Sequence, residues 1–201
     1  MNICIDDNAL KRALSEFKIM KKILDKLNIN ISPIREYNET TLSMCKLLVV
    51  LAKSESKFTS QEVKAIIDYT IRGGALLILL HQANDWILES NIKELTDVLG
   101  VFSRCDRVIE KNGERYIVIP VSDKKHALLN DIKEIHYPEG CSLLSKKRPL
   151  TELILRTPED VIPKKAPIVI ATRYGNGRAI IIGSYKIFSD NWITRGDNAI
   201  F

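Results

Sequence analysis

The sequence lacks the features that mark membrane-spanning and secreted proteins. Its longest apolar runs, residues 47–52 and 75–80, are far shorter than the about 20 residues that a membrane helix needs. The first residues do not combine a basic segment with an apolar one, so we expect no secretory signal. The sequence therefore predicts a cytoplasmic protein without a membrane span.

Metal-ligating residues are scarce and scattered. No two of the four cysteines have the Cys-x-x-Cys spacing of a zinc or redox site, and the three histidines are isolated from one another. We therefore predict no metal site and no cofactor. The cysteines are expected to be free, mostly buried thiols in a reducing cytosol, with a disulfide between two of them as the alternative. The residues concerned are Cys4, Cys45, Cys105, Cys141, His81, His126 and His136.

Aromatic residues make up only 6% of the chain, although its net charge is +5. The basic residues form small clusters at 124–125, 146–148 and 164–165, and no aromatic residue lies among them. Proteins that bind single-stranded nucleic acid combine a basic groove with stacking aromatics. Nucleic acid is therefore not an expected partner.

The first half of the chain alternates between strand and helix patterns. Continuous apolar runs at 46–52 and 75–81 predict parallel strands that are buried on both faces. The helix between them is expected to begin after Thr59 or Ser60 and to end at Gly73-Gly74, with a right-handed crossover. Further elements are predicted as a strand at 1–5, a helix at 9–27, an edge strand around Pro33 and a helix at 90–99.

The second half predicts antiparallel hairpins. One is expected over residues 106–120 with its turn at Asn112-Gly113, and another over residues 166–184 with its turn at 174–177. Asp197 is expected to cap a C-terminal helix that the chain end truncates. No linker interrupts the pattern, so residues 1–201 are predicted to form a single α/β domain, with a mostly parallel core and antiparallel hairpins in its C-terminal half.

Known catalytic patterns are incomplete. Asp6 and Asp7 follow the first strand, as in phosphate-receiver domains, but the third strand ends without a carboxylate, so a helix cap is the better interpretation. A class I amidotransferase needs a cysteine on a strand-to-helix turn, and Cys141 stands in a loop instead. The sequence around Ser184 lacks the second glycine of Gly-x-Ser-x-Gly.

Polar residues follow two predicted strands at their carboxyl ends, where open α/β sheets bind ligands. They predict a shallow cleft for a small ligand. The favoured alternative is structural: Ser189 and Asp190 satisfy backbone groups, while Tyr185, Phe188 and Trp192 pack over the sheet edge. The candidate ligand-binding residues are His81, Gln82, Asn84, Asp85, Ser184, Asp190 and Asn191.

Three segments, "KFTSQEVKAIIDYTIRGGALLILL", "YPEGCSLL" and "GNGRAIIIGSYKIFSDNW" with the later "DNAIF", resemble a known family. This is the class I glutamine-amidotransferase-like domain without a catalytic triad. It stands at the N-terminus of the 52 kDa subunit of intraflagellar transport complex B and in related uncharacterised bacterial and archaeal proteins. The resemblance implies a flavodoxin-like, three-layer α/β/α fold.

The resemblance also implies a function. It carries over no catalytic residue, so we expect a non-catalytic scaffold or protein-interaction domain, not an enzyme, with another protein as partner. The first alternative is a sugar- or nucleotide-binding module that uses the strand-end residues. The second is a hydrolase- or amidotransferase-like enzyme whose catalytic residues are unrecognised.

Overall fold

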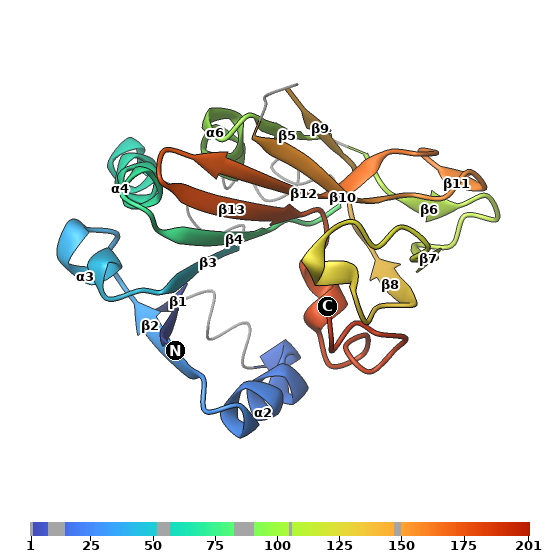
Figure 1. The fold of residues 1–201 in the computed structure, drawn as a ribbon, viewed down its shortest axis with the longest axis horizontal. Coiled ribbons are helices and arrows are strands. Elements are labelled where there is room, and N and C mark those ends of the chain that lie inside the picture. The colour runs from blue at the N-terminus through green and yellow to red at the C-terminus, as the bar shows by residue number, and fades with distance from the viewer. Residues whose placement is uncertain (1, 8–14, 52–56, 83–90, 105, 147–149) are drawn as a thin grey trace.

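A seven-stranded sheet forms the centre of the fold (Figure 1). The computed structural model describes residues 2–7, 15–51, 57–82, 91–104, 106–146 and 150–201. The strand order is β10-β12-β13-β4-β3-β1-β2; the strands from β13 to β2 are parallel, and β12 and β10 are antiparallel to their neighbours. The predicted α/β class is therefore confirmed. The strands are β1 (Asn2–Asp6), β2 (Asn30–Ile34), β3 (Leu47–Leu51), β4 (Ala75–Leu79), β10 (Thr151–Arg156), β12 (Pro167–Tyr174) and β13 (Gly177–Ile182).

Three helices cover one face of this sheet: α3 (Glu39–Ser43), α4 (Ser60–Ile71) and α6 (Ile92–Val98). Helix α4 begins as predicted, because Thr59 and Glu62 form a reciprocal capping box. It ends at Ile71 with Arg72 as its C-cap, and the following Gly73 has a φ of +108°, which suits a residue without a β-carbon. The predicted helix between two parallel strands is thus confirmed, but burial of these strands on both faces is not, because Leu47, Val49, Ala75 and Leu77 are only partly buried.

The other face carries helix α2 (Lys18–Lys26) and an irregular layer of short elements. Within this layer β7 (Tyr116–Pro120) pairs with β8 (Glu134–Pro138), and the 3₁₀ turns η1 (Ala127–Leu129) and η2 (Tyr185–Phe188) lie nearby. Elsewhere β5 (Val101–Ser103) pairs with β9 (Leu143–Ser145). Helices therefore cover the two faces unequally.

The predicted hairpin over residues 106–120 is wrong. The turn at Gly113 closes, because Glu110 N donates to Glu114 O, but the ladder ends there. Strand β6 (Ile109–Glu110) pairs with β11 (Val161–Ile162), and β7 pairs with β8. A turn signal fixes local geometry only, whereas burial of the flanking residues selects the strand partners.

The hairpin predicted over residues 166–184 is confirmed as β12 and β13. Its second strand also lies parallel to β4, with Ile182 opposite Leu79. Both strands therefore end at the same edge of the sheet, and this register brings the segments after residues 80 and 183 together.

Two of the cysteines are not free thiols. Cys4 in β1 and Cys45, just before β3, form a disulfide, while Cys141 is free and buried. Cys105 lies outside the described residues. The expectation of free thiols is therefore wrong for one pair. The pairing depends on β1 and β3 being neighbours in the sheet, which cysteine spacing does not reveal.

Candidate functional site

The segments that follow β4 and β13 are in contact. Tyr185 N donates to Leu80 O at 2.7 Å, and Leu80 N donates to Ile182 O at 2.9 Å. These bonds continue the parallel ladder beyond the two strands. Side chains from both segments consequently share one polar region at the carboxyl edge of the sheet.

Glu139 lies at the centre of this region. Its Oε2 accepts a hydrogen bond from Lys186 Nζ at 2.7 Å, and Gln82 Nε2 and His81 Nε2 lie 3.5 and 3.9 Å away. The His81 ring lies against Tyr185, with 5.4 Å between ring centroids. We call His81, Gln82, Glu139, Tyr185 and Lys186 the Glu139 cluster.

The backbone holds this cluster in place. Glu139 has a φ of +43°, and its carbonyl oxygen accepts from Gln82 N at 3.1 Å. Gln82 is buried, yet its Oε1 has no hydrogen-bond partner among the described residues. The cluster therefore combines one carboxylate, one ammonium group and an unsatisfied amide oxygen, which are groups suited to binding a small polar molecule.

Sequence reasoning missed Glu139 and Lys186. Glu139 follows β8, a strand outside the main sheet, so its approach to His81 depends on tertiary packing. The only sequence signal was its place in "YPEGCSLL", one of the segments that carry the family resemblance.

Ser184 and Cys141 are turned inward. Both are fully buried; the Ser184 hydroxyl donates to Pro138 O, and the Cys141 thiol donates to Gly183 O at 3.6 Å. Tyr137 donates to Cys141 O at 2.8 Å, and burial raises the pKa of its hydroxyl well above the usual value. These groups hydrogen-bond to the backbone of the loops.

The other predicted site residues are dispersed. Asp190 Oδ1 accepts from Ile19 N, and Asp190 N donates to Glu16 O, both at 2.7 Å. Ser189 Oγ donates to Lys186 O. Ser189 and Asp190 thus form hydrogen bonds with backbone groups, as the structural alternative predicts. Asn191 is exposed, and Asn84 and Asp85 lie outside the described residues.

Asn198 and Asp197 anchor the C-terminal turn, a role that the sequence did not predict for either residue. Asn198 is 1% exposed and bonds to three backbone segments. The Asp197 carboxylate accepts from Lys133 N and Glu134 N at the start of β8, and not from a helix of its own. Residues 197–200 form a turn, so the structure shows no helix at the predicted start.

Protonation of Asp197 is expected to loosen this anchor. The two backbone N–H donors lower the pKa of Asp197, so the carboxylate stabilises the fold above the unfolded value of about 3.9, and this contribution is lost as pH falls through the folded pKa. Asp197→Asn should therefore lower the unfolding midpoint at pH 7, and the difference from the parent should shrink below about pH 4. Urea titrations across that range measure it. An equal deficit at every pH would contradict the assignment.

Phe188, which the structural alternative expects to pack over the sheet edge, is only partly buried. It packs against the core beneath η2. We expect Phe188→Ala to cost about 1–2 kcal/mol, below the about 3–5 kcal/mol of a fully buried phenylalanine. Thermal unfolding measures this, and an unchanged midpoint would show that Phe188 does not anchor the loop.

The order and direction of the parallel strands define the class of protein, a flavodoxin-like α/β domain. The sequence model of the IFT52 GIFT domain family matches residues 5–120, which are 116 of the 201 residues. The chain therefore belongs to the IFT52 GIFT domain family. No curated protein matches the sequence.

Solved structures support this assignment at the level of the fold. The mmIFT52 N-terminal domain is 21% identical with a TM-score of 0.85, covering 100% of this chain and 93% of that one. The cytoplasmic protein STM1381 of Salmonella typhimurium is 14% identical with a TM-score of 0.66, covering 96% and 91%. A putative ThuA-like protein of Bacteroides uniformis is 15% identical with a TM-score of 0.64, covering 99% and 86%.

Within the described part of the chain, no helix has the length and apolar character needed to cross a membrane.

Proposed function

We propose that this chain is a non-catalytic protein-interaction or scaffold domain that works in the cytoplasm. Its family membership sets the context, since the matching model describes a domain of IFT52. The observation that carries the proposal is the state of its candidate nucleophiles. Ser184 and Cys141 are the nucleophilic side chains in the segments that follow β13 and β8, and both are buried and bonded to backbone carbonyls.

A catalytic nucleophile needs a base within hydrogen-bond reach and an open position for the substrate. Ser184 has Pro138 O as its acceptor, and a carbonyl oxygen does not remove a proton. The His81 imidazole lies instead against Tyr185 and near Glu139. The arrangement rigidifies the loops and leaves no nucleophile–base pair among these groups.

Kinetic assays of Ser184→Ala and Cys141→Ala test the proposal. The parent chain and both variants are assayed with glutamine and with p-nitrophenyl esters. We expect no turnover above buffer, together with a loss of stability in Ser184→Ala of about 1–3 kcal/mol because a buried carbonyl loses its donor. Turnover by the parent that either variant abolishes would overturn the proposal.

The Glu139 cluster supports a second candidate function, the binding of a small polar molecule such as a sugar or nucleotide. The supporting observation is Gln82 Oε1, which is buried beside Glu139 and receives no hydrogen bond from the part of the chain that the structure describes. A ligand hydroxyl or amino group placed there would satisfy it.

A thermal-shift screen of sugars and nucleotides tests this candidate. A ligand at about 100 times its Kd adds about 2.7 kcal/mol of stability. Gln82→Leu should abolish the shift, whereas Asn191→Ala, at an exposed position, should retain it. A screen without a shift, or a shift that Gln82→Leu retains, would exclude this candidate.

A further inference from the structure

The two faces of the central sheet are covered unequally. Leu48, Val50 and Ile78 point toward α3, α4 and α6 and are fully buried. Their neighbours Val49 and Leu77 point to the opposite face and remain partly exposed. Parallel sheets normally bury both faces under helices. The described residues therefore cover the α2 side of this sheet incompletely.

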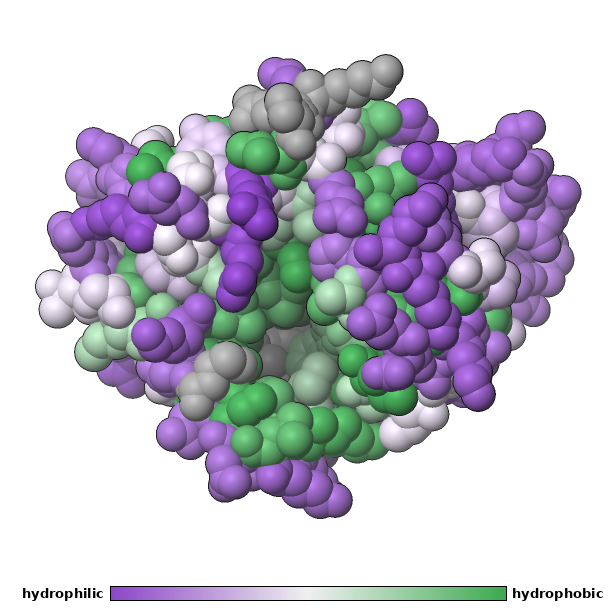
Figure 2. Space-filling view, viewed as in Figure 1, coloured by the Kyte–Doolittle hydropathy of each residue, from purple (hydrophilic) through white to green (hydrophobic). Residues whose placement is uncertain are grey.

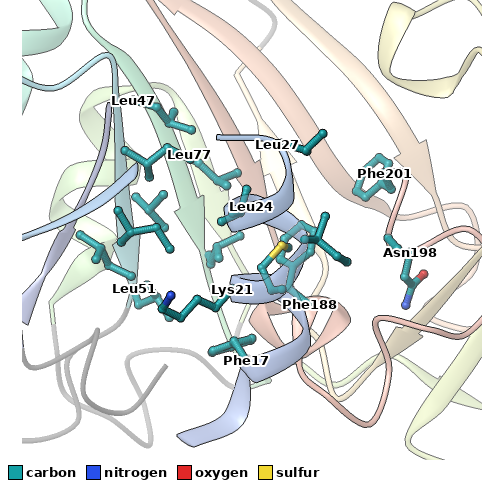
Figure 3. Close-up of a pocket in the computed structure, with 18 of the residues that line it drawn as sticks. Phe17, Lys21, Leu24, Leu27, Leu47, Leu51, Leu77, Phe188, Asn198 and Phe201 are labelled. Carbon is teal, nitrogen blue, oxygen red and sulfur yellow. The ribbon is translucent and has the colours of Figure 1, made fainter. Parts of the chain in front are cut away.

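An apolar groove runs over this exposed face. It consists of two hollows of about 340 and 290 Å³ that share Leu47, Leu77, Phe188 and Phe201 in their walls. Figure 2 shows apolar residues gathered around the opening. In Figure 3, Leu47, Leu51 and Leu77 from the strands lie opposite Leu24 of α2, with Phe188 and Phe201 beyond.

Helix α2 forms a wall of the groove without closing it. The helix has a marked apolar stripe, yet none of its residues is buried. At the rim, Leu27 beside α2 and Ile200 of the C-terminal turn are 62% and 63% exposed. Among the described residues, apolar side chains from both sides thus surround a space that they do not fill.

The charged side chains that line the groove among the described residues all have one sign. Its charged lining residues among those described are Lys21, Lys46 and Arg178. Lys21 pairs with Asp25 at the surface, whereas Lys46 and Arg178 are exposed and form no ion pair within the described part of the chain. An occupant with acidic residues beside an apolar stripe would complement this lining.

The groove offers little to a polar ligand. The only uncharged polar residue in its described lining, Asn198, directs its amide to the backbone at His136, Ile187 and Trp192. Sugars and nucleotides require several hydrogen-bonding groups from their site. This distinguishes the groove from the Glu139 cluster.

We propose that this apolar groove binds an amphipathic α-helix of a partner protein, with acidic residues flanking the apolar stripe of that helix. The inference rests on the proposed interaction function and names the surface and the kind of partner. Such a helix would cover the partly exposed strand residues as helices cover the opposite face, and its acidic residues would meet Lys46 and Arg178.

The charge pattern disfavours a second copy of this chain as occupant. Its own loosely packed helix, α2, carries four lysines and one aspartate. Inserted into the groove of another copy, α2 would bring positive charge toward Lys46 and Arg178, which is repulsive.

Peptide display on the intact chain tests the proposal. A library of random 16-residue peptides is selected for binding to the parent chain and counter-selected on Leu27→Asp/Ile200→Asp. Leu27 and Ile200 are both exposed, so this double variant should fold. Circular dichroism verifies its folding. Leu144→Asp is the matched control, because Leu144 is an exposed leucine of β9 outside the groove lining.

We expect the selected peptides to have apolar residues at i, i+3, i+4 and i+7 with Asp or Glu between them, and to become helical on binding. The Leu27→Asp/Ile200→Asp variant should bind the selected peptides with at least tenfold lower affinity, and Leu144→Asp should bind them with unchanged affinity. Lys46→Glu/Arg178→Glu should weaken acidic peptides by a similar factor, with a smaller difference at high salt.

Several outcomes would overturn the proposal: no selected binder, extended or basic binders, or binders insensitive to the groove variants. Sedimentation that shows a dimer lost in Leu27→Asp would identify a second copy as the occupant instead. Peptides whose binding requires Lys186 and not Leu27 would overturn the proposal that the groove is the binding site. The proposed interaction function would remain. Turnover of an amide or ester would overturn the function itself, so the two failures are distinguishable.

Discussion

Replacement of Asn198 by alanine is expected to destabilise the protein by about 3 kcal/mol, because it leaves several buried backbone groups without partners. Asn198 Oδ1 accepts from His136 N at 2.9 Å, and Nδ2 donates to His136 O at 2.9 Å. The side chain therefore bonds to β8 as a neighbouring strand would. Nδ2 also lies within hydrogen-bond distance of Trp192 O and Ile187 O, so one amide joins β8, η2 and the C-terminal turn.

Thermal and urea unfolding measure the effect of Asn198→Ala. For a chain of this size, about 3 kcal/mol corresponds to a fall in Tm of about 6–12 °C. Asn191→Ala is the control, since Asn191 is exposed, and it should change stability by less than about 0.5 kcal/mol. Equal midpoints for the two variants would show that the buried amide does not hold the C-terminal turn.

Gly183→Ala is the second substitution with a large expected effect, a loss of at least about 3 kcal/mol. A β-carbon at this position would overlap the carbonyl oxygen of Cys141 and the hydroxyl of Tyr137. The first of these belongs to backbone that cannot move freely, because Cys141 N donates to Gly183 O and Gly183 N donates to Ile168 O, both at 3.0 Å. The added methyl group would have to break at least one of these contacts.

Gly113→Ala supplies the comparison for this prediction. Gly113 has a φ of +89°, but a β-carbon there would meet nothing within 4 Å. Its replacement should cost only the backbone strain, about 1–2 kcal/mol. Urea unfolding of both variants separates steric overlap from strain. A Gly183→Ala variant as stable as Gly113→Ala would mean that the loops around Cys141 relax without loss.

These two positions explain the polar loop after β13. Gly183 permits the close approach of the loop at Cys141, and Ser184 then donates to Pro138 O. Asn198 holds the far end of the same region against β8. The polar residues of this segment, which resemble those of a catalytic loop, thus mainly form hydrogen bonds with backbone groups. This agrees with the proposed interaction role.

Local patterns predicted much of the parallel half of the sheet. The apolar runs at β3 and β4, the capping box at Thr59 and the glycine after α4 are all signals within a few residues, and the structure has a strand, a cap or a helix end at each of them. The β12–β13 hairpin was predictable for the same reason, because its turn and its apolar strands are contiguous in the sequence.

Pairings between distant segments were less predictable. Strand β6 pairs with β11 and not with β7, although a turn lies directly after it. The Cys4–Cys45 disulfide and the approach of Glu139 to His81 join residues 41 and 58 positions apart. No local propensity encodes such contacts, because their free energy arises from burial that exists only after the chain has folded.

By itself, the sequence determined the α/β class, the main parallel strands, the family resemblance and the absence of a recognisable nucleophile motif. Hydrophobic periodicity, caps and turns carry that information because they act over a few neighbouring residues. Only the tertiary structure decided that Ser184 and Cys141 face inward, that Glu139 and Lys186 join His81, and that the described residues leave one sheet face partly open. Those properties depend on which surfaces the folded chain covers, and coverage is decided by the packing of segments far apart in the sequence.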